Sequence, residues 1–277
     1  MLYRVFDGHC DTPVELWLQE KQLRSSDLAV SLDKAAGLGG YAQFFAFCTA
    51  WIKTRMPHTE HFSRALDYFL AQLRKNEDRI TLCRTAPEAE AAMQAGKCAA
   101  FLAIEGAEAV REDEGLLELA YEAGVRMVSL VWNLPNGLSG SCQTGEGLTE
   151  KGKHFFRRAQ KLGMLVDVSH LSEKGFWDMA ELAEKPIVAS HSDSFAVCPH
   201  PRNLTDAQFQ AICDLGGEGH LALGADLDGC SVLPEGFAAL NDYETLGRYL
   251  ADAGYPDETI QNLFCNSLMK VVKTCIM

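Results

Sequence analysis

Short apolar segments recur along the whole 277-residue chain, and a stretch with helix start and stop signals follows each of them. These segments are hydrophobic on both faces, as strands of a parallel sheet are when helices cover both sides. The regular alternation of strand and helix along one chain predicts an α/β fold. The seven predicted strands cover residues 2–6, 43–48, 99–104, 127–131, 164–168, 186–189 and 220–223.

Polar caps and glycines mark where the helices between these strands begin and end. Thr149 and Ser172 are predicted N-caps, and Thr205 with Gln208 three residues later fits a capping box. Gly124 follows a helical stretch and is a predicted left-handed C-cap. The predicted helices cover residues 59–75, 87–96, 112–123, 149–163, 172–183, 205–215 and 257–273.

Length and composition favour one barrel over other classes of protein. The 277 residues are close to the roughly 250 that a (β/α)8 barrel needs, so we expect a single TIM-barrel-like domain over residues 1–277. The apolar fraction of 47% is too high for intrinsic disorder. The formal charge of −13 argues against a nucleic-acid partner, because phosphate binding needs a basic surface.

The sequence shows neither a targeting signal nor a membrane span. It has no uninterrupted apolar run of about 18 residues, and its start, MLYRVFDGHCD, lacks the apolar core of a secretory signal. The ten cysteines are scattered without a CxxC pair, which favours reduced thiols. We therefore expect a cytoplasmic protein without a membrane partner.

Side chains of the metal-binding types follow five of the seven predicted strands. They are His9, Asp11, Glu105, His170, His191 and Asp226. His9 and Asp11 are two residues apart, so they share a face at the end of the first strand. Because the carboxyl ends of barrel strands converge on one mouth, we expect all six side chains to meet there.

Three histidines and three carboxylates exceed the ligands of one ion and suit two divalent ions with a bridging carboxylate. Such a pair deprotonates a bridging water at neutral pH and polarises a carbonyl, while a nearby carboxylate shuttles the proton. The chain has no GxSxG elbow, no P-loop and no GxGxxG after a strand. The sequence therefore favours metal-dependent hydrolysis.

The stretches around these residues resemble the membrane dipeptidase (renal dipeptidase) family of zinc metallopeptidases, including its bacterial members. The resemblance runs in the family's order from the start of the chain to about residue 230. The matching stretches are 7–12 (DGHCDT), 104–106 (IEG), 147–149 (GLT), 166–172 (VDVSHLS), 189–192 (ASHS), 202–205 (RNLT) and 223–229 (LGADLDG).

This resemblance implies a barrel hydrolase that cleaves dipeptides with two divalent metal ions, usually zinc. His9 and Asp11 would bind the first ion, His170 and His191 the second, and Glu105 would bridge both. Asp226 would take a proton from the metal-bridging water and pass it to the leaving amine.

Arg202 matches the arginine that receives the terminal carboxylate of the substrate, a group that suits a guanidinium fork. This match would limit the activity to dipeptides, since a longer peptide places no carboxylate there. The family also accepts a D-residue at the C-terminal position, and some members open the β-lactam ring of penems. The resemblance further implies a homodimer.

Two features depart from the family pattern. Many members carry a histidine after the fourth strand that contacts the scissile carbonyl, and Trp132 occupies that position here. Because tryptophan offers one N–H donor and no base, we expect Trp132 to line the substrate pocket without a catalytic role. The helix over 205–215 also runs directly into the last strand, so the chain lacks about one βα unit, the one that supplies the seventh strand.

Two alternative functions remain open from the sequence. Another two-metal amidohydrolase could act on cyclic amides, lactones or N-acyl amino acids. Trp132 and the absent βα unit also suit a catalytically impaired barrel that binds metal or peptide. A barrel with an absent strand exposes two unpaired edges, which are costly unless something covers them.

Overall fold

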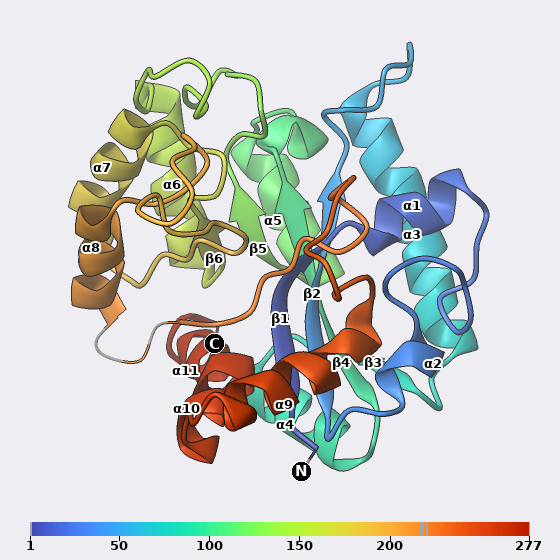
Figure 1. The fold of residues 1–277 in the computed structure, drawn as a ribbon. Helices are drawn as coiled ribbons and strands as arrows, with labels where there is room; N and C mark the ends of the chain where they lie inside the picture. The colour runs from blue at the N-terminus through green and yellow to red at the C-terminus, as the bar shows by residue number, and fades with distance from the viewer. Residues whose placement is uncertain (1, 217–218, 220, 277) are drawn as a thin grey trace.

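Parallel strands form one curved sheet in the computed structural model, which describes residues 2–216, 219 and 221–276. The strand order is β1-β2-β4-β5-β6, and the short β3 pairs with the amino end of β4 (Figure 1). The bounds are Val5–Cys10 for β1, Tyr41–Cys48 for β2, Ile80–Leu82 for β3, Cys98–Glu105 for β4, Val125–Ser129 for β5 and Leu165–Asp167 for β6. The α/β fold that the sequence predicts is therefore confirmed.

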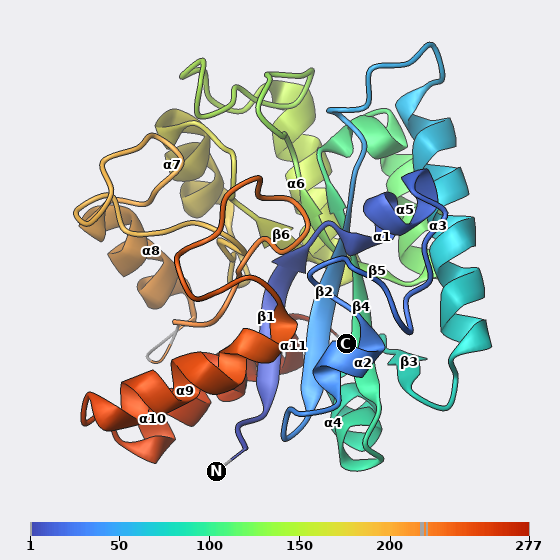
Figure 2. The ribbon, with the colours of Figure 1, turned by 45° about the vertical axis from the view of Figure 1, so that its right-hand side comes forward.

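Helices cover the outer face of this sheet, and α5 to α8 pack side by side in chain order (Figure 2). The described helices are α1 Thr12–Leu18, α2 Leu32–Ala35, α3 His58–Lys75, α4 Ala86–Gln94, α5 Glu114–Ala123, α6 Glu150–Leu162, α7 Glu173–Leu182, α8 Asp206–Gly216, α9 Tyr243–Asp252, α10 Asp257–Gln261 and α11 Ser267–Cys275. The predicted caps are confirmed, since the side chains of Thr149 and Ser172 accept hydrogen bonds from the first turns of α6 and α7. Gly124 ends α5 in the left-handed conformation.

Each of the last two predicted strands joins the curved sheet, here called the barrel wall, through a single parallel bridge. Val188 pairs with Asp167 of β6, and Leu223 pairs with Asp7 of β1. The predicted start of the last strand at His220 lies outside the described residues. Within the described part of the chain, no backbone hydrogen bond joins residues 186–190 to residues 221–224. Seven parallel segments of the described chain thus form the barrel wall, and none of the described residues occupies the position of the seventh of eight strands.

The two ends of this wall touch each other directly at Gly224. A Cβ atom at this position would overlap the backbone carbonyl oxygen of Ser190, so the approach requires glycine. A Cβ at Gly8 of β1 would also lie only 3.1 Å from the same oxygen. The wall is therefore closed at its carboxyl end, where the predicted site lies, without an eighth strand.

Replacing Gly224 with alanine should destabilise the protein, because the new methyl group must push the two ends of the wall apart. Overpacking against backbone typically costs about 1–3 kcal/mol of unfolding free energy. Urea denaturation of the variant measures this cost. Gly37→Ala is the matched control, since nothing lies within 4 Å of a Cβ there. Equal stability of the two variants would contradict this description of the closure.

The amino-terminal half of the barrel interior is filled by aromatic side chains. Phe6, Phe44 and Phe101 stack on one another with ring centroids 5.1–5.6 Å apart. Leu268 and Val272 of α11 belong to the same buried cluster, so this helix covers the end of the barrel opposite the predicted site. The polar side chains of the barrel are thereby left to its carboxyl end.

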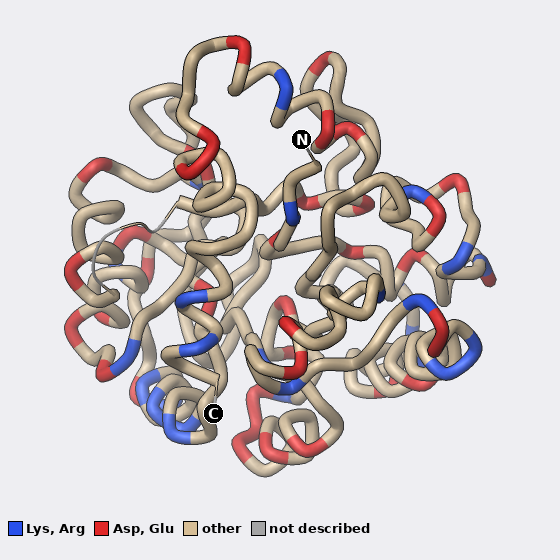
Figure 3. Tube along the Cα trace, turned by 90° about the horizontal axis from the view of Figure 1, so that it is seen from below, with Lys and Arg blue, Asp and Glu red and all other residues tan. Residues whose placement is uncertain are grey.

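Charged residues are spread around the outside of the molecule. The 38 acidic and 25 basic residues do not separate into an acidic and a basic side (Figure 3). Among the helices described here, none combines the length and the hydropathy that crossing a membrane requires.

Candidate active site

The carboxyl ends of the strands bring all six predicted metal-type side chains together. His9 lies in β1, Glu105 is the last residue of β4, and His170 follows β6. Within each of three groups, the ligand atoms lie within 4.8 Å of one another. The groups are His9, Asp11 and Glu105; Glu105, His170 and His191; and His9, His191 and Asp226. The convergence that the strand order predicts is therefore seen in the structure.

Glu105 stands between His9 on one side and the pair His170 and His191 on the other. Its Oε2 lies 3.3 Å from Nε2 of His9. Its Oε1 lies 2.7 Å from Nε2 of His170 and 3.3 Å from Nε2 of His191. Each carboxylate oxygen thus faces a different imidazole set, which is the arrangement that a carboxylate bridging two cations needs.

Hydrogen bonds at the opposite ring nitrogens orient the three imidazoles. The Ser190 hydroxyl lies 2.7 Å from Nδ1 of His191 and 3.3 Å from Nδ1 of His9, and it donates to Oδ2 of Asp167 at 2.6 Å. Nδ1 of His170 lies 2.9 Å from Oδ1 of Asn133. Because Nδ1 is engaged in every case, Nε2 is the nitrogen that points to Glu105 and to the centre of the cluster, where Nε2 of His170 also lies 3.0 Å from Nε2 of His191.

The carboxylates of the cluster favour positive charge at its centre, as the pKa of His9 shows. Burial lowers the pKa of His9, but the carboxylates of Glu105 and Asp11 outweigh burial and raise that pKa well above the usual imidazole value. Burial and the Glu105 carboxylate raise the pKa of Asp11 to about 7. Burial and His9 lower the pKa of His191 to about 4, so His191 is in the neutral form that binds metal.

Three buried atoms at the centre of this cluster make no hydrogen bond of acceptable geometry to any described residue, although Oε1 of Glu105 lies 2.7 Å from Nε2 of His170. They are Nε2 of His9, Oδ1 of Asp11 and Oε1 of Glu105. Buried polar atoms are normally satisfied, so such a group of orphans points to a missing partner. Imidazole nitrogen and carboxylate oxygen are the ligands of zinc and similar divalent ions, and the residues present therefore fit a metal centre.

Asp226 lies at the edge of the cluster, with Oδ1 3.8 Å from Nε2 of His9. The thiol of Cys230 donates a hydrogen bond to its Oδ2 at 3.0 Å. Asp226 and His170 have φ values of 51° and 70°, a left-handed conformation that costs free energy for residues other than glycine. The fold thus holds the backbone of both residues in an unfavourable conformation at the site.

Arg202 and Trp132 lie beside the cluster, as predicted. Nη2 of Arg202 is 3.2 Å from Nε2 of His170, and its Nη1 donates to the Ser192 hydroxyl at 3.1 Å. The Trp132 ring lies 6.2 Å from the His170 ring. Arg202 and Trp132 line a cavity of about 690 Å³ together with Glu105, His170 and Asp226.

Sequence reasoning missed several residues of this site. Ser190 and Asn133 orient the imidazoles, Cys230 contacts Asp226, and Trp51 lines the same cavity. Ser190 directly precedes the predicted ligand His191, and Asn133 directly follows Trp132, so these two lie beside predicted site residues in the sequence. The others come from loops whose path depends on the whole fold.

Comparison with known proteins points to one family. A family model described as membrane dipeptidase (Peptidase family M19) matches residues 2–217. An uncharacterized protein from the PQQ-III 3' region of Acinetobacter calcoaceticus is 33% identical over 249 residues, covering 77% of this chain and 78% of that protein.

Two solved structures share the fold over its whole length. One is a metallo peptidase from Rhodobacter sphaeroides liganded with a phosphinate mimic of the dipeptide L-Ala-D-Ala. It is 26% identical, with a TM-score of 0.87, and the match covers 99% of this chain and 100% of that one. The other is a metallo peptidase called dipeptidase AC, which is 26% identical, with a TM-score of 0.89 and coverage of 100% and 99%.

Proposed function

Because the chain belongs to the membrane dipeptidase family of metallopeptidases, we propose that it hydrolyses dipeptides with two divalent ions, zinc in the first place. His9 and Asp11 would hold one ion, His170 and His191 the other, and Glu105 would hold both. The observation that carries this proposal is the position of Glu105, whose two oxygens face the two imidazole sets.

The bound ions would polarise the scissile carbonyl and lower the pKa of the attacking water. The protein's own acid–base group in this proposal is Asp226. It lies beside His9 in the cavity of about 690 Å³, which we call the substrate cavity. Its carboxylate would accept the proton of the water and deliver it to the amine that leaves. The Cys230 thiol keeps one oxygen of Asp226 engaged, which leaves Oδ1 turned towards His9.

Arg202 would bind the free carboxylate of the C-terminal residue. Its guanidinium lies beside His170, and its second terminal nitrogen reaches Ser192. A charged, forked donor at this place suits a carboxylate with two oxygens. Dipeptides place such a group next to the scissile bond, whereas longer peptides do not.

Replacing Arg202 with alanine should raise KM and lower kcat/KM for a dipeptide by about 10–100-fold, because a hydrogen bond to a charged group is worth about 1.5–3 kcal/mol. The same dipeptide with a C-terminal amide should be a poor substrate for both proteins, and the substitution should change its kcat/KM little. Steady-state kinetics with the two substrates measures this difference. An equal loss on the acid and the amide would rule out the proposed role.

A substrate panel separates this function from its alternatives. The Rhodobacter sphaeroides relative was solved with a mimic of L-Ala-D-Ala, and we propose that this chain also accepts a D-residue at the C-terminal position. The panel contains L-Ala-L-Ala, L-Ala-D-Ala, N-acetyl-L-alanine and a cyclic amide. Hydrolysis of the dipeptides alone supports the proposal. Preference for either of the last two would favour another two-metal amidohydrolase.

A further inference from the structure

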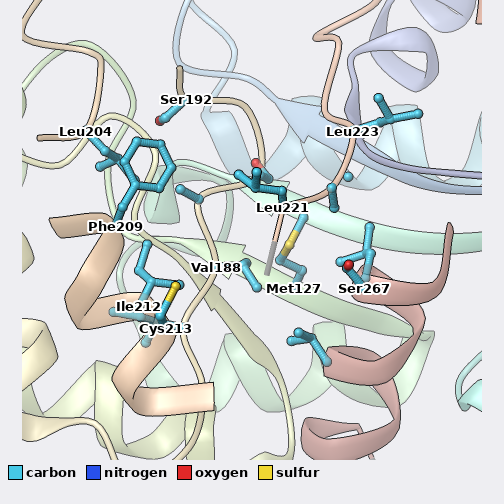
Figure 4. A pocket seen from close by; sticks show the side chains of 17 residues that line it. Met127, Val188, Ser192, Leu204, Phe209, Ile212, Cys213, Leu221, Leu223 and Ser267 are labelled. Carbon is cyan, nitrogen blue, oxygen red and sulfur yellow. The ribbon is translucent and has the colours of Figure 1, made fainter. Parts of the chain in front are cut away.

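A second cavity lies between the two ends of the barrel wall, where the residues that the structure describes supply no seventh strand. Figure 4 shows Phe209, Ile212 and Cys213 of α8 on one side of it and Ser267 of α11 on another. Its volume is about 140 Å³. It is separate from the substrate cavity, since the two have no described lining residue in common.

Apolar side chains that would be covered in a complete barrel are open to this cavity. Val188, Ala189 and Leu223 are half-buried, whereas every residue of β1, β2 and β4 is buried. Leu221 at the rim is 66% exposed. The absent strand thus leaves an apolar hollow that a molecule can enter from the surface.

The closure of the wall excludes a peptide strand as the occupant. Neighbouring strands lie about 4.8 Å apart, so an inserted strand would need roughly twice that distance between residues 186–190 and 221–224. Gly224 instead packs directly on the carbonyl oxygen of Ser190. The space below this contact can therefore hold a small molecule but not a segment that pairs along both edges.

The lining selects for an uncharged occupant. None of the 17 lining residues that the structure describes carries a charge. The few polar groups include the hydroxyl of Ser190, which already donates to Asp167 and lies 2.7 Å from Nδ1 of His191. A water molecule needs two to four polar partners, and an apolar cavity of about 150 Å³ is known to take benzene.

We propose that this cavity binds one small, uncharged, largely apolar molecule of about the size of a benzene ring. Such a ligand differs from a dipeptide, which carries two charges and suits the acidic and basic side chains of the substrate cavity. The inference does not depend on the proposed function, because binding in this cavity requires neither metal nor hydrolysis.

Thermal unfolding of the whole chain with and without benzene tests this proposal. Ligand at about ten times its Kd should raise the Tm by roughly 2–3 °C for a protein of this size. Benzoate has the same ring and a negative charge. On the metal-free Arg202→Ala variant, which has lost the carboxylate-binding guanidinium, benzoate should raise the Tm much less than benzene does. Absence of a benzene effect, or an equal effect of benzoate, would overturn the proposal.

Filling the cavity provides the matched control. Ile212→Phe places a larger ring at the α8 side and should remove the benzene-induced shift, whereas Gln210→Phe on the exposed face of the same helix should keep it. If Ile212→Phe does not fold, Val271→Phe from the α11 side replaces it. A benzene-induced shift that persists in Ile212→Phe would show that the cavity is not the benzene site. Dissociation of a dimer by the same substitution would show that a second copy of the chain covers the cavity in place of a small molecule.

Discussion

Glu105→Gln should remove the metal centre and lower kcat/KM for a dipeptide by about 10³-fold, because metal ions contribute several kcal/mol to the transition state of such hydrolysis. The substitution is nearly isosteric, but it replaces a charged carboxylate by an amide with one oxygen. Oε1 and Oε2 face different imidazoles, so one amide cannot serve both sides. Elemental analysis and steady-state kinetics on the same preparation measure the two losses.

Glu108→Gln is the matched control for this variant. Glu108 lies three residues further along the chain, and its Oε1 accepts a hydrogen bond from Asn136 at 2.9 Å. It belongs to none of the metal-type groups among the described residues. The control should keep its metal and most of its activity. Full metal content in Glu105→Gln, together with more than about a tenth of the activity, would contradict the bridging role.

Asp226→Asn should lower kcat by about 10²–10⁴-fold, which is the usual contribution of a positioned acid–base group. An amide cannot accept the proton from water, and the affinity for the substrate should change little. Metal content should stay close to that of the parent protein, because the other five side chains complete the two groups around Glu105. A measurement of kcat, KM and metal content on one preparation separates proton transfer from metal loss.

Asp228→Asn provides the comparison for Asp226. Its carboxylate accepts hydrogen bonds from the Thr12 hydroxyl and from the backbone of Ala29 and Val30, so its part in the loop is structural. This variant should lose stability and keep most of its kcat. An equal fall of kcat in both variants, or the loss of metal in Asp226→Asn, would show that Asp226 is not the acid–base group.

The convergence of the six metal-type side chains was predictable because these residues directly follow apolar strands. Glu105 ends β4, and His170 comes three residues after β6, so the sequence alone places them at the same edge of the sheet. The first strand lies at Val5–Cys10 rather than at residues 2–6. The polar residues of β1 are buried with hydrogen-bond partners; Asp7, for example, accepts a hydrogen bond from the backbone N–H of His9. A strand prediction based on apolar residues alone therefore ends too early.

Other parts of the fold depend on contacts that no local pattern contains. The helix α9 was not predicted, yet its Tyr243 is buried and donates a hydrogen bond to Asp7, 236 positions earlier in the chain. The three-residue β3 is too short for a recognisable alternation. The absence of one strand could be inferred from the sequence, but the direct closure at Gly224 follows only from three-dimensional packing.

Metal content and metal-dependent hydrolysis, measured on the same purified protein, test the central claim most directly. The chain should carry close to two divalent ions, and a chelator should abolish hydrolysis of L-Ala-L-Ala and L-Ala-D-Ala. Added zinc should restore that activity. A protein with less than one ion per chain, and without hydrolysis that any added divalent metal restores, would contradict the proposal of a two-metal dipeptidase.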